Sequence, residues 1–336
     1  MQSPGHPMPH PSRASALLSV VALISLTGGC RSAPQTALSG SAPSPAASRP
    51  GTAPSEQGLG VLVMAHGGGE EWNHNVSASV AGLRDRMPLA VAFGMANPHT
   101  LQTALDELDS QGASTIAVVR LFLSGASFLH QTEFLFGHRP DPPERAMMGH
   151  RMVPGSDLPP LETDARVLLD MAGMAGSEQV NRIVLARADA ASPDPTRTGV
   201  LVIAHGMGAE EENQRLLDAM EESAHRLRST GFGEARIATL REDWAEARAR
   251  AEQEIRATAS QMTKEWDRVV VIPYRVYGFG PYAEVLDGLD YVGTDGLLPH
   301  RLVGDWVAAR ASAVFCEAGL VPALEPCAAV LEPAGR

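Results

Sequence analysis

Residues 60–67 read GVLVMAHG, and residues 199–206 read GVLVIAHG. Seven of these eight positions are identical, and the remaining change exchanges Met for Ile. Each copy is a short apolar run without charge, which is typical of a strand buried on both faces of a parallel sheet. The chain is therefore predicted to be an internal duplication in which the first strand of each copy ends in His-Gly.

After each His-Gly, the same pattern of helix, strand, helix and strand follows. Strands that alternate with helices of this length indicate βαβ units and a parallel sheet with right-handed crossovers. We predict an α/β fold with two tandem domains, each a small parallel sheet flanked by helices, related by a pseudo-twofold duplication. The predicted strands of the first copy are 60–66, 89–95 and 115–123, and its helices are 70–86 and 98–111. Those of the second copy are strands 199–205, 235–240 and 268–274 and helices 209–229 and 242–262.

The composition divides the chain into five segments. We predict a signal peptide over 1–30, a disordered tether rich in Pro, Ala and Ser over 31–58, domains over 59–195 and 196–320, and a tail over 321–336. The tether has almost no large apolar side chains and cannot bury enough surface to fold. The remaining length suits two small domains.

The first thirty residues have the pattern of an export signal. Arg13 supplies a positive charge, residues 16–26 are mostly apolar, and small residues precede Cys30. The apolar run is too short to span a bilayer, which favours a signal peptide. The end of this segment resembles a bacterial lipobox, which implies lipidation at Cys30 and an exported, membrane-anchored protein on the periplasmic side or cell surface. The alternative is an ordinary secretory signal that contains a cysteine by chance.

The charge and the remaining cysteines limit the function further. A formal net charge of −12 argues against nucleic acid as a partner. Cys316 and Cys327 are the other cysteines, and outside the cytoplasm they could form a disulfide. They could equally be two free thiols.

Two histidines and a carboxylate in the first copy could form a metal site. Ligands of parallel α/β sheets gather beyond the carboxyl ends of the strands, where His66 should lie. His130 follows the third predicted strand, and Glu133 is one helical turn further on. Imidazole and carboxylate together suit a divalent transition metal. The alternatives are that His66 is packed in a βα turn and that His130 is a helix-surface residue.

The second copy offers a poorer ligand set. It keeps His205 but has no histidine shortly after its third strand, where Glu284 is the available carboxylate. We therefore treat His205 and Glu284 as secondary candidates. The first copy is predicted to be the active half, and the second a structural or substrate-covering partner.

Together these residues resemble the class II chelatases, the sirohydrochlorin cobaltochelatases and ferrochelatases of cobalamin and sirohaem synthesis. The shared features are the first strand ending in His-Gly, the turn MANP at 95–98, and FLSGASFLHQTE at 122–133. The similarity covers about residues 59–310, and long members of that family are tandem duplications with the metal ligands in the N-terminal copy.

The resemblance implies two chelatase-like domains and a lyase that inserts Co²⁺, Fe²⁺ or Ni²⁺ into sirohydrochlorin or a related tetrapyrrole. His66 would bind the metal and accept a pyrrole proton, and His130 would be the second ligand. The metal would be a substrate, and no organic cofactor is expected. Since the tetrapyrrole is a polycarboxylate, arginines should contact it. The candidates are Arg120, Arg139, Arg145, Arg151 and Arg275.

Two other functions stay open. The export signal, and the position of His130 five residues after Gly125, favour a non-catalytic lipoprotein that binds metal or tetrapyrrole on a chelatase scaffold. A hydrolase that uses the glycines at 67–69 is the third alternative, but the chain has neither a Gly-x-Ser-x-Gly elbow nor a P-loop lysine motif.

Overall fold

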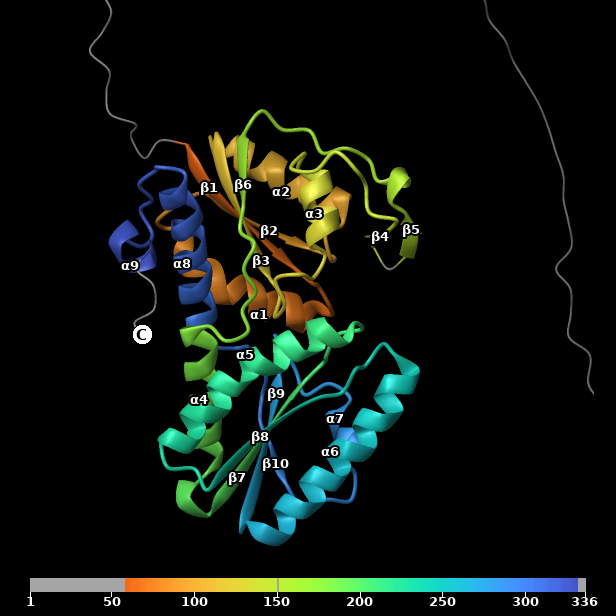
Figure 1. Ribbon diagram of the computed structural model, residues 1–336. Helices are drawn as coiled ribbons and strands as arrows, with labels where there is room; N and C mark the ends of the chain where they lie inside the picture. The colour runs from red at the N-terminus through yellow and green to blue at the C-terminus, as the bar shows by residue number, and fades with distance from the viewer. Residues whose placement is uncertain (1–57, 150, 332–336) are drawn as a thin grey trace, which may run out of the picture. The chain divides into compact units, whose positions relative to one another are not determined.

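A computed structural model describes residues 58–149 and 151–331 (Figure 1). The predicted signal peptide with Cys30, and the tether up to residue 57, lie outside these ranges. No helix in the described ranges is long and apolar enough to cross a lipid bilayer.

Two four-stranded parallel sheets with the same strand order confirm the predicted fold class. The central strands β1 and β7 are buried along their whole length, as their uncharged apolar sequences predict. Each pairs with the second and third strands of its own half. The first sheet has the order β2-β1-β3-β6, from β1 (Leu59–Ala65), β2 (Leu89–Phe93), β3 (Thr115–Leu121) and β6 (Arg166–Leu169). The second has the order β8-β7-β9-β10, from β7 (Thr198–Ala204), β8 (Glu234–Thr239), β9 (Arg268–Tyr274) and β10 (Val292–Gly293).

Helices connect the strands at nearly the predicted places. The pyrrolidine of Pro98 occupies the first turn of α2, and the side chain of Asn97 caps that helix by accepting from His99 N. The α-helices are α1 (Glu70–Val80), α2 (Pro98–Ser110), α3 (Leu129–Leu135), α4 (Glu178–Ala191), α5 (Glu210–Ser229), α6 (Ala245–Glu265), α7 (Tyr282–Val285), α8 (Arg301–Glu317) and α9 (Cys327–Leu331). Short 3-10 helices lie at Ala81–Leu83, Gly155–Asp157 and Pro195–Arg197.

The two halves exchange a helix. The boundary at 195/196 separates the two sheets, but α4, which precedes it, contacts β9 and α5 of the second half. Helix α8, which follows the second sheet, contacts α1, β3 and β6 of the first half (Figure 1). At the crossing of α8 with α1, a Cβ on Gly304 would lie 2.2 Å from the carbonyl oxygen of Ser79. One apolar core therefore runs through both halves.

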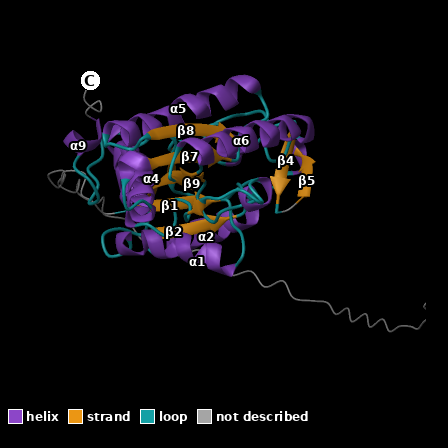
Figure 2. Cartoon of the chain, turned by 90° about the horizontal axis from the view of Figure 1, so that it is seen from below, coloured by secondary structure: helices purple, strands orange, loops and turns teal. Residues whose placement is uncertain are grey.

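A hairpin that the sequence analysis did not predict stands apart from both sheets in Figures 1 and 2. Its strands are β4 (Arg145–Met148) and β5 (Arg151–Pro154), which pair antiparallel. The Gln131 amide of α3 donates to the carbonyl oxygens of Ala96, at 2.9 Å, and Met147, at 2.7 Å. The Gln131 carbonyl accepts from Met147 N at 2.8 Å. One buried side chain of α3 thus ties the hairpin to the loop after β2.

The N-cap of α8 makes stability depend on pH. The Nδ1 atom of His300 accepts from Leu302 N at 3.2 Å, which requires the neutral ring. Burial, followed by the charges of Arg187 and Arg301, lowers the pKa of His300. A histidine with a folded pKa below its unfolded value of about 6.5 loses stability as pH falls below that unfolded value. Urea unfolding at about pH 7.5 and pH 5.5 should show this loss, and it should be smaller in His300→Asn, which keeps a capping side chain without the titration.

Cys316 and Cys327 form a disulfide, which resolves the alternative left open by the sequence. It ties the end of α8 to the start of α9, 11 residues further along the chain. Closing a loop of this length restricts the unfolded chain, so Cys316→Ser with Cys327→Ser should lower the free energy of unfolding by about 2–3 kcal/mol. Chemical denaturation of the wild type and the double variant, each with and without reductant, checks this. Reductant should lower the free energy of unfolding of the wild type and leave that of the double variant unchanged. Equal free energies of unfolding for the wild type and the double variant without reductant would contradict this prediction.

Candidate functional site

The glycine after each histidine is required by the backbone. Gly67 and Gly206 have φ angles of 83° and 87°, in the left-handed region. A Cβ on Gly67 would lie 3.2 Å from Gly94 N, and one on Gly206 would lie 2.9 Å from Arg241 N. Each His-Gly turn therefore passes close to the loop that follows the neighbouring strand, which explains why the same dipeptide ends β1 and β7.

His66 is exposed at the carboxyl end of β1, as predicted. Its Nδ1 lies 2.8 Å from Gly67 O, and because a carbonyl oxygen only accepts, Nδ1 carries the proton. The Nε2 lone pair is then the one that can bind a metal or take a proton. Metal-binding histidines commonly have their other ring nitrogen held in this way. The ring of Trp72 lies beside it, with centroids 6.3 Å apart.

His130 and Glu133 lie on α3 and already have partners. His130 Nε2 lies 3.2 Å from Asp141 O, which leaves Nδ1 as the nitrogen with a lone pair. Glu133 forms an ion pair with Arg139, with 3.2 Å between Oε2 and Nη1. Within residues 58–149 and 151–331, no three His, Cys, Asp or Glu side chains form a group that could hold a metal. His66, His130 and Glu133 are thus not one cluster here, and their roles stay predictions.

Arg120 is a structural residue and does not contact solvent. Its side chain is fully buried at the end of β3. It donates to the carbonyl oxygens of Asp170, Ser127, Gly125 and Met171, at 2.6–3.2 Å. Burial lowers the pKa of Arg120, and the charge of Asp170 opposes this. The expectation that it binds a substrate carboxylate is therefore wrong, because its donors already fix the loops after β3 and β6.

His205 differs from His66 in the partner of its second nitrogen. Its Nδ1 lies 2.9 Å from Gly206 O, as in the first copy, but Nε2 lies 3.1 Å from Oδ2 of Asp243. Trp244 packs edge-on against the ring, with centroids 5.9 Å apart. No local sequence signal marks Asp243 and Trp244, which lie in the loop between β8 and α6, although β8 ends at the same edge of the sheet.

Two further candidates, Glu284 and Arg275, lie on the second half. Glu284 is on the short helix α7. Arg275 pairs with Glu242, with 3.3 Å between Nη1 and Oε1, and lies over the ring of Tyr282. Its guanidinium is therefore engaged inside the protein.

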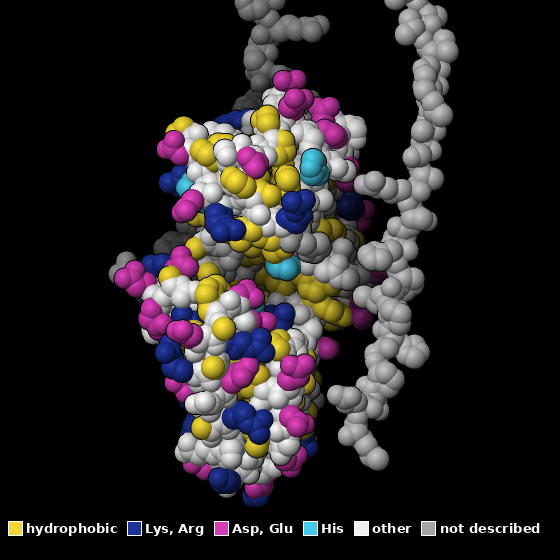
Figure 3. All heavy atoms as spheres, turned by 90° about the vertical axis from the view of Figure 1, so that its right-hand side faces the viewer, with side chains coloured by type: hydrophobic (Ala, Val, Ile, Leu, Met, Phe, Trp, Pro, Cys, Tyr) yellow, Lys and Arg dark blue, Asp and Glu magenta, His cyan; other side chains and the backbone are white. Residues whose placement is uncertain are grey.

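The carboxyl edges of the two sheets lie close together. Glu71 of α1 belongs to the first half, and Tyr277 follows β9 in the second half. A hydrogen bond between their side chains raises the pKa of Tyr277. Side chains from both edges pack partly buried against the common core, among them Trp72, Phe93, Leu123, Met207 and Val276. Figure 3 shows hydrophobic side chains and a histidine gathered at mid-height on this side of the molecule. An apolar surface with exposed imidazole suits a large flat ligand and a metal ion.

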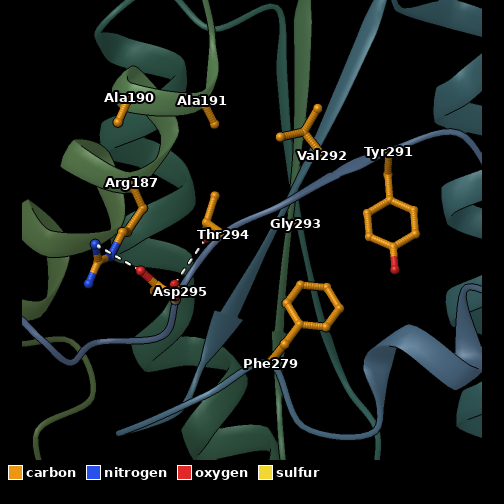
Figure 4. Close-up of a pocket in the computed structure, with 9 residues that line it drawn as sticks. All are labelled: Arg187, Ala190, Ala191, Phe279, Tyr291, Val292, Gly293, Thr294 and Asp295. Atoms are coloured by element: carbon orange, nitrogen blue, oxygen red, sulfur yellow. Dashed lines mark hydrogen bonds and ion pairs between the residues drawn. The ribbon is translucent and has the colours of Figure 1, made fainter. Parts of the chain in front are cut away.

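A hollow of about 740 Å³ lies beside β10 (Figure 4). Phe279 and Tyr291 line it as a stacked pair with centroids 6.0 Å apart. Arg187 stands at its other end, where its Nη1 lies 3.8 Å from Oδ2 of Asp295. No candidate histidine is among the residues that line it.

Comparison with known proteins identifies the fold. Residues 60–133 match the model of the CbiX family, and no curated protein matches the chain significantly. The fold is similar to SirB from Bacillus subtilis with Fe3+, at 14% identity and a TM-score of 0.55, over 78% of this chain and 97% of that one. It is also similar to the sirohydrochlorin chelatase SirB from Bacillus subtilis subspecies spizizenii in complex with cobalt, at 14% identity and a TM-score of 0.51, over 76% of this chain and 95% of that one. The chain thus has the fold of these chelatase structures, and its residues 60–133 are similar to the CbiX family.

Proposed function

We propose that the protein inserts a divalent metal, Co²⁺, Fe²⁺ or Ni²⁺, into sirohydrochlorin or a related tetrapyrrole. The observation that carries the proposal is the exposed His66 at the end of β1, inside the segment that matches the CbiX family. Its Nδ1–H is held by Gly67 O, so Nε2 is the nitrogen that carries the lone pair.

We assign the residues the following roles, which this geometry supports. His66 Nε2 would bind the metal substrate, and the neutral ring would accept a pyrrole proton as the metal enters the macrocycle. His130 would contribute Nδ1, because its Nε2–H is held by Asp141 O. Glu133 would have to leave Arg139 before it could bind a cation. His66 is therefore the residue on which the proposal depends most.

The place of action is part of the proposal. The export signal and Cys30 support a lipid-anchored protein on the periplasmic side or cell surface. The tetrapyrrole would then have to be present outside the cytoplasm. Globomycin sensitivity of processing, with a Cys30→Ala control, tests the anchor independently of the activity.

A direct assay tests the reaction. The full chain is mixed with sirohydrochlorin and Co²⁺ under anaerobic conditions, and the absorbance of the macrocycle is followed beside a protein-free mixture and a heat-unfolded sample. The same assay with Fe²⁺ and Ni²⁺ gives the metal preference. We expect faster insertion with the folded chain than with either control.

A non-catalytic carrier is the second candidate. The ion pair of Glu133 with Arg139 favours it, because the carboxylate is occupied and is not available as a third metal ligand. A spectral shift that reports binding, without any acceleration of metal insertion, would support the carrier and reject the enzyme.

A further inference from the structure

Two nitrogen-bearing side chains at the carboxyl edge of the second sheet, Arg241 and His205, each lie beside a strongly exposed carboxylate. Arg241 Nη1 lies 3.0 Å from Oε2 of Glu210, and the side chains are 12% and 80% exposed, respectively. His205 Nε2 lies 3.1 Å from Oδ2 of Asp243, whose side chain is 72% exposed. In both pairs the protein holds the nitrogen, while the carboxylate extends into solvent. The guanidinium of Arg241 always donates, whereas Nε2 of His205 donates only when the ring is doubly protonated, because its Nδ1–H is held by Gly206 O.

The guanidinium of Arg241 is fixed by the loop around it. Its Nη2 donates to Gly208 O at 2.7 Å, and its buried Nε has no hydrogen-bond partner among the described residues. The backbone of Arg241 has a φ of 58°, which is rare for a side chain of this size. A strained backbone and an unpaired buried donor both raise the free energy of the folded protein, and strained backbones cluster at ligand sites.

An exposed aromatic ring stands next to these two side chains. The indole of Trp244 is 37% exposed and packs edge-on against the imidazole of His205. On its other side it covers Gly208, where a Cβ would lie 2.5 Å from the indole nitrogen. Trp244 is thus held in place with part of its apolar surface facing solvent.

We infer that Arg241, His205 and Trp244 form a subsite for a flat ring that bears carboxylates. Glu210 and Asp243 occupy the positions of the ligand's carboxylates until the ligand displaces them. Exposed ion pairs contribute little to stability, so the displacement costs little, and arginine is well suited to carboxylates. That the ring is a tetrapyrrole rests on the proposed function, and the second half would then hold the substrate while the first presents the metal.

A binding experiment without metal tests this subsite. The full chain is titrated with metal-free uroporphyrin, a polycarboxylate, and with its methyl ester, and binding is followed by the porphyrin absorbance. Glu210→Gln and Asp243→Asn remove the internal competitors and should each tighten uroporphyrin binding by about two- to fivefold. The matched control is Glu211→Gln, which removes the same charge from the same turn of α5 and should change the affinity less. Arg241→Gln should weaken binding about tenfold or more.

The expected pattern also requires that the ester bind more weakly than the acid. The proposal is overturned if the ester binds equally well, or if Glu210→Gln and Asp243→Asn bind no more tightly than Glu211→Gln. These two surface variants decide the question even where Arg241→Gln is unstable. Failure of the proposed function gives a different result: the variants would change uroporphyrin binding as expected, but the chain would not accelerate metal insertion.

Discussion

His66→Ala should reduce the rate of metal insertion by at least about 100-fold, the usual loss when a positioned proton acceptor is removed. The effect should be larger still if the same nitrogen also binds the metal. The measurement is the absorbance change of sirohydrochlorin with Co²⁺, compared between the variant and the wild-type chain. Affinity for the metal-free macrocycle should be nearly unchanged, because a metal-binding and proton-accepting nitrogen acts on the chemical step.

A nearby histidine supplies the matched control for this experiment. His74 is exposed on α1, close to His66 in the sequence. His74→Ala should insert metal at the wild-type rate. Equal activity of His66→Ala and wild type would remove the proposed site from the first half, whereas equal losses in both variants would indicate an indirect effect on folding.

Arg120→Met should lower the free energy of unfolding by about 3–5 kcal/mol, because it leaves buried carbonyl acceptors without their donor and takes a cationic neighbour from the buried Asp170. The guanidinium of Arg120 connects the loop after β3 with the loop after β6. Methionine has a similar length, so most of the loss should come from the hydrogen bonds. Urea denaturation measures the free energy, and hydrogen exchange should show faster opening of residues 124–127 and 170–173.

Arg139→Met is the matched control for Arg120→Met. Arg139 is 45% exposed and pairs with Glu133 on the surface, so its loss should cost less than about 1 kcal/mol. Similar effects of the two substitutions would contradict the assignment of Arg120 as the residue that fixes these loops.

Predicted element boundaries were accurate where the signal is local. The first strand of each copy was expected at 60–66 and 199–205, and the strands are Leu59–Ala65 and Thr198–Ala204. The first helix was expected to continue to residue 86, but α1 ends at Val80 and a 3-10 turn follows. Gly82, a poor helix former, lies in that turn. The predicted start of α6 was three residues early, because the chain first makes the turn that contains Arg241, which has a left-handed backbone.

The sequence alone was sufficient to predict the two parallel sheets and the position of His66, since apolar runs and strand-helix alternation are properties of neighbouring residues. The partners of the charged side chains depended on the tertiary structure. The sequence suggested Arg120 as a substrate contact, but in the fold its guanidinium donates to backbone carbonyl groups. Asp243 is a candidate only because the fold places it beside His205. The exchange of α4 and α8 between the halves likewise depends on contacts between residues far apart in the chain. Such contacts follow from the packing of the whole core, for which no local pattern exists.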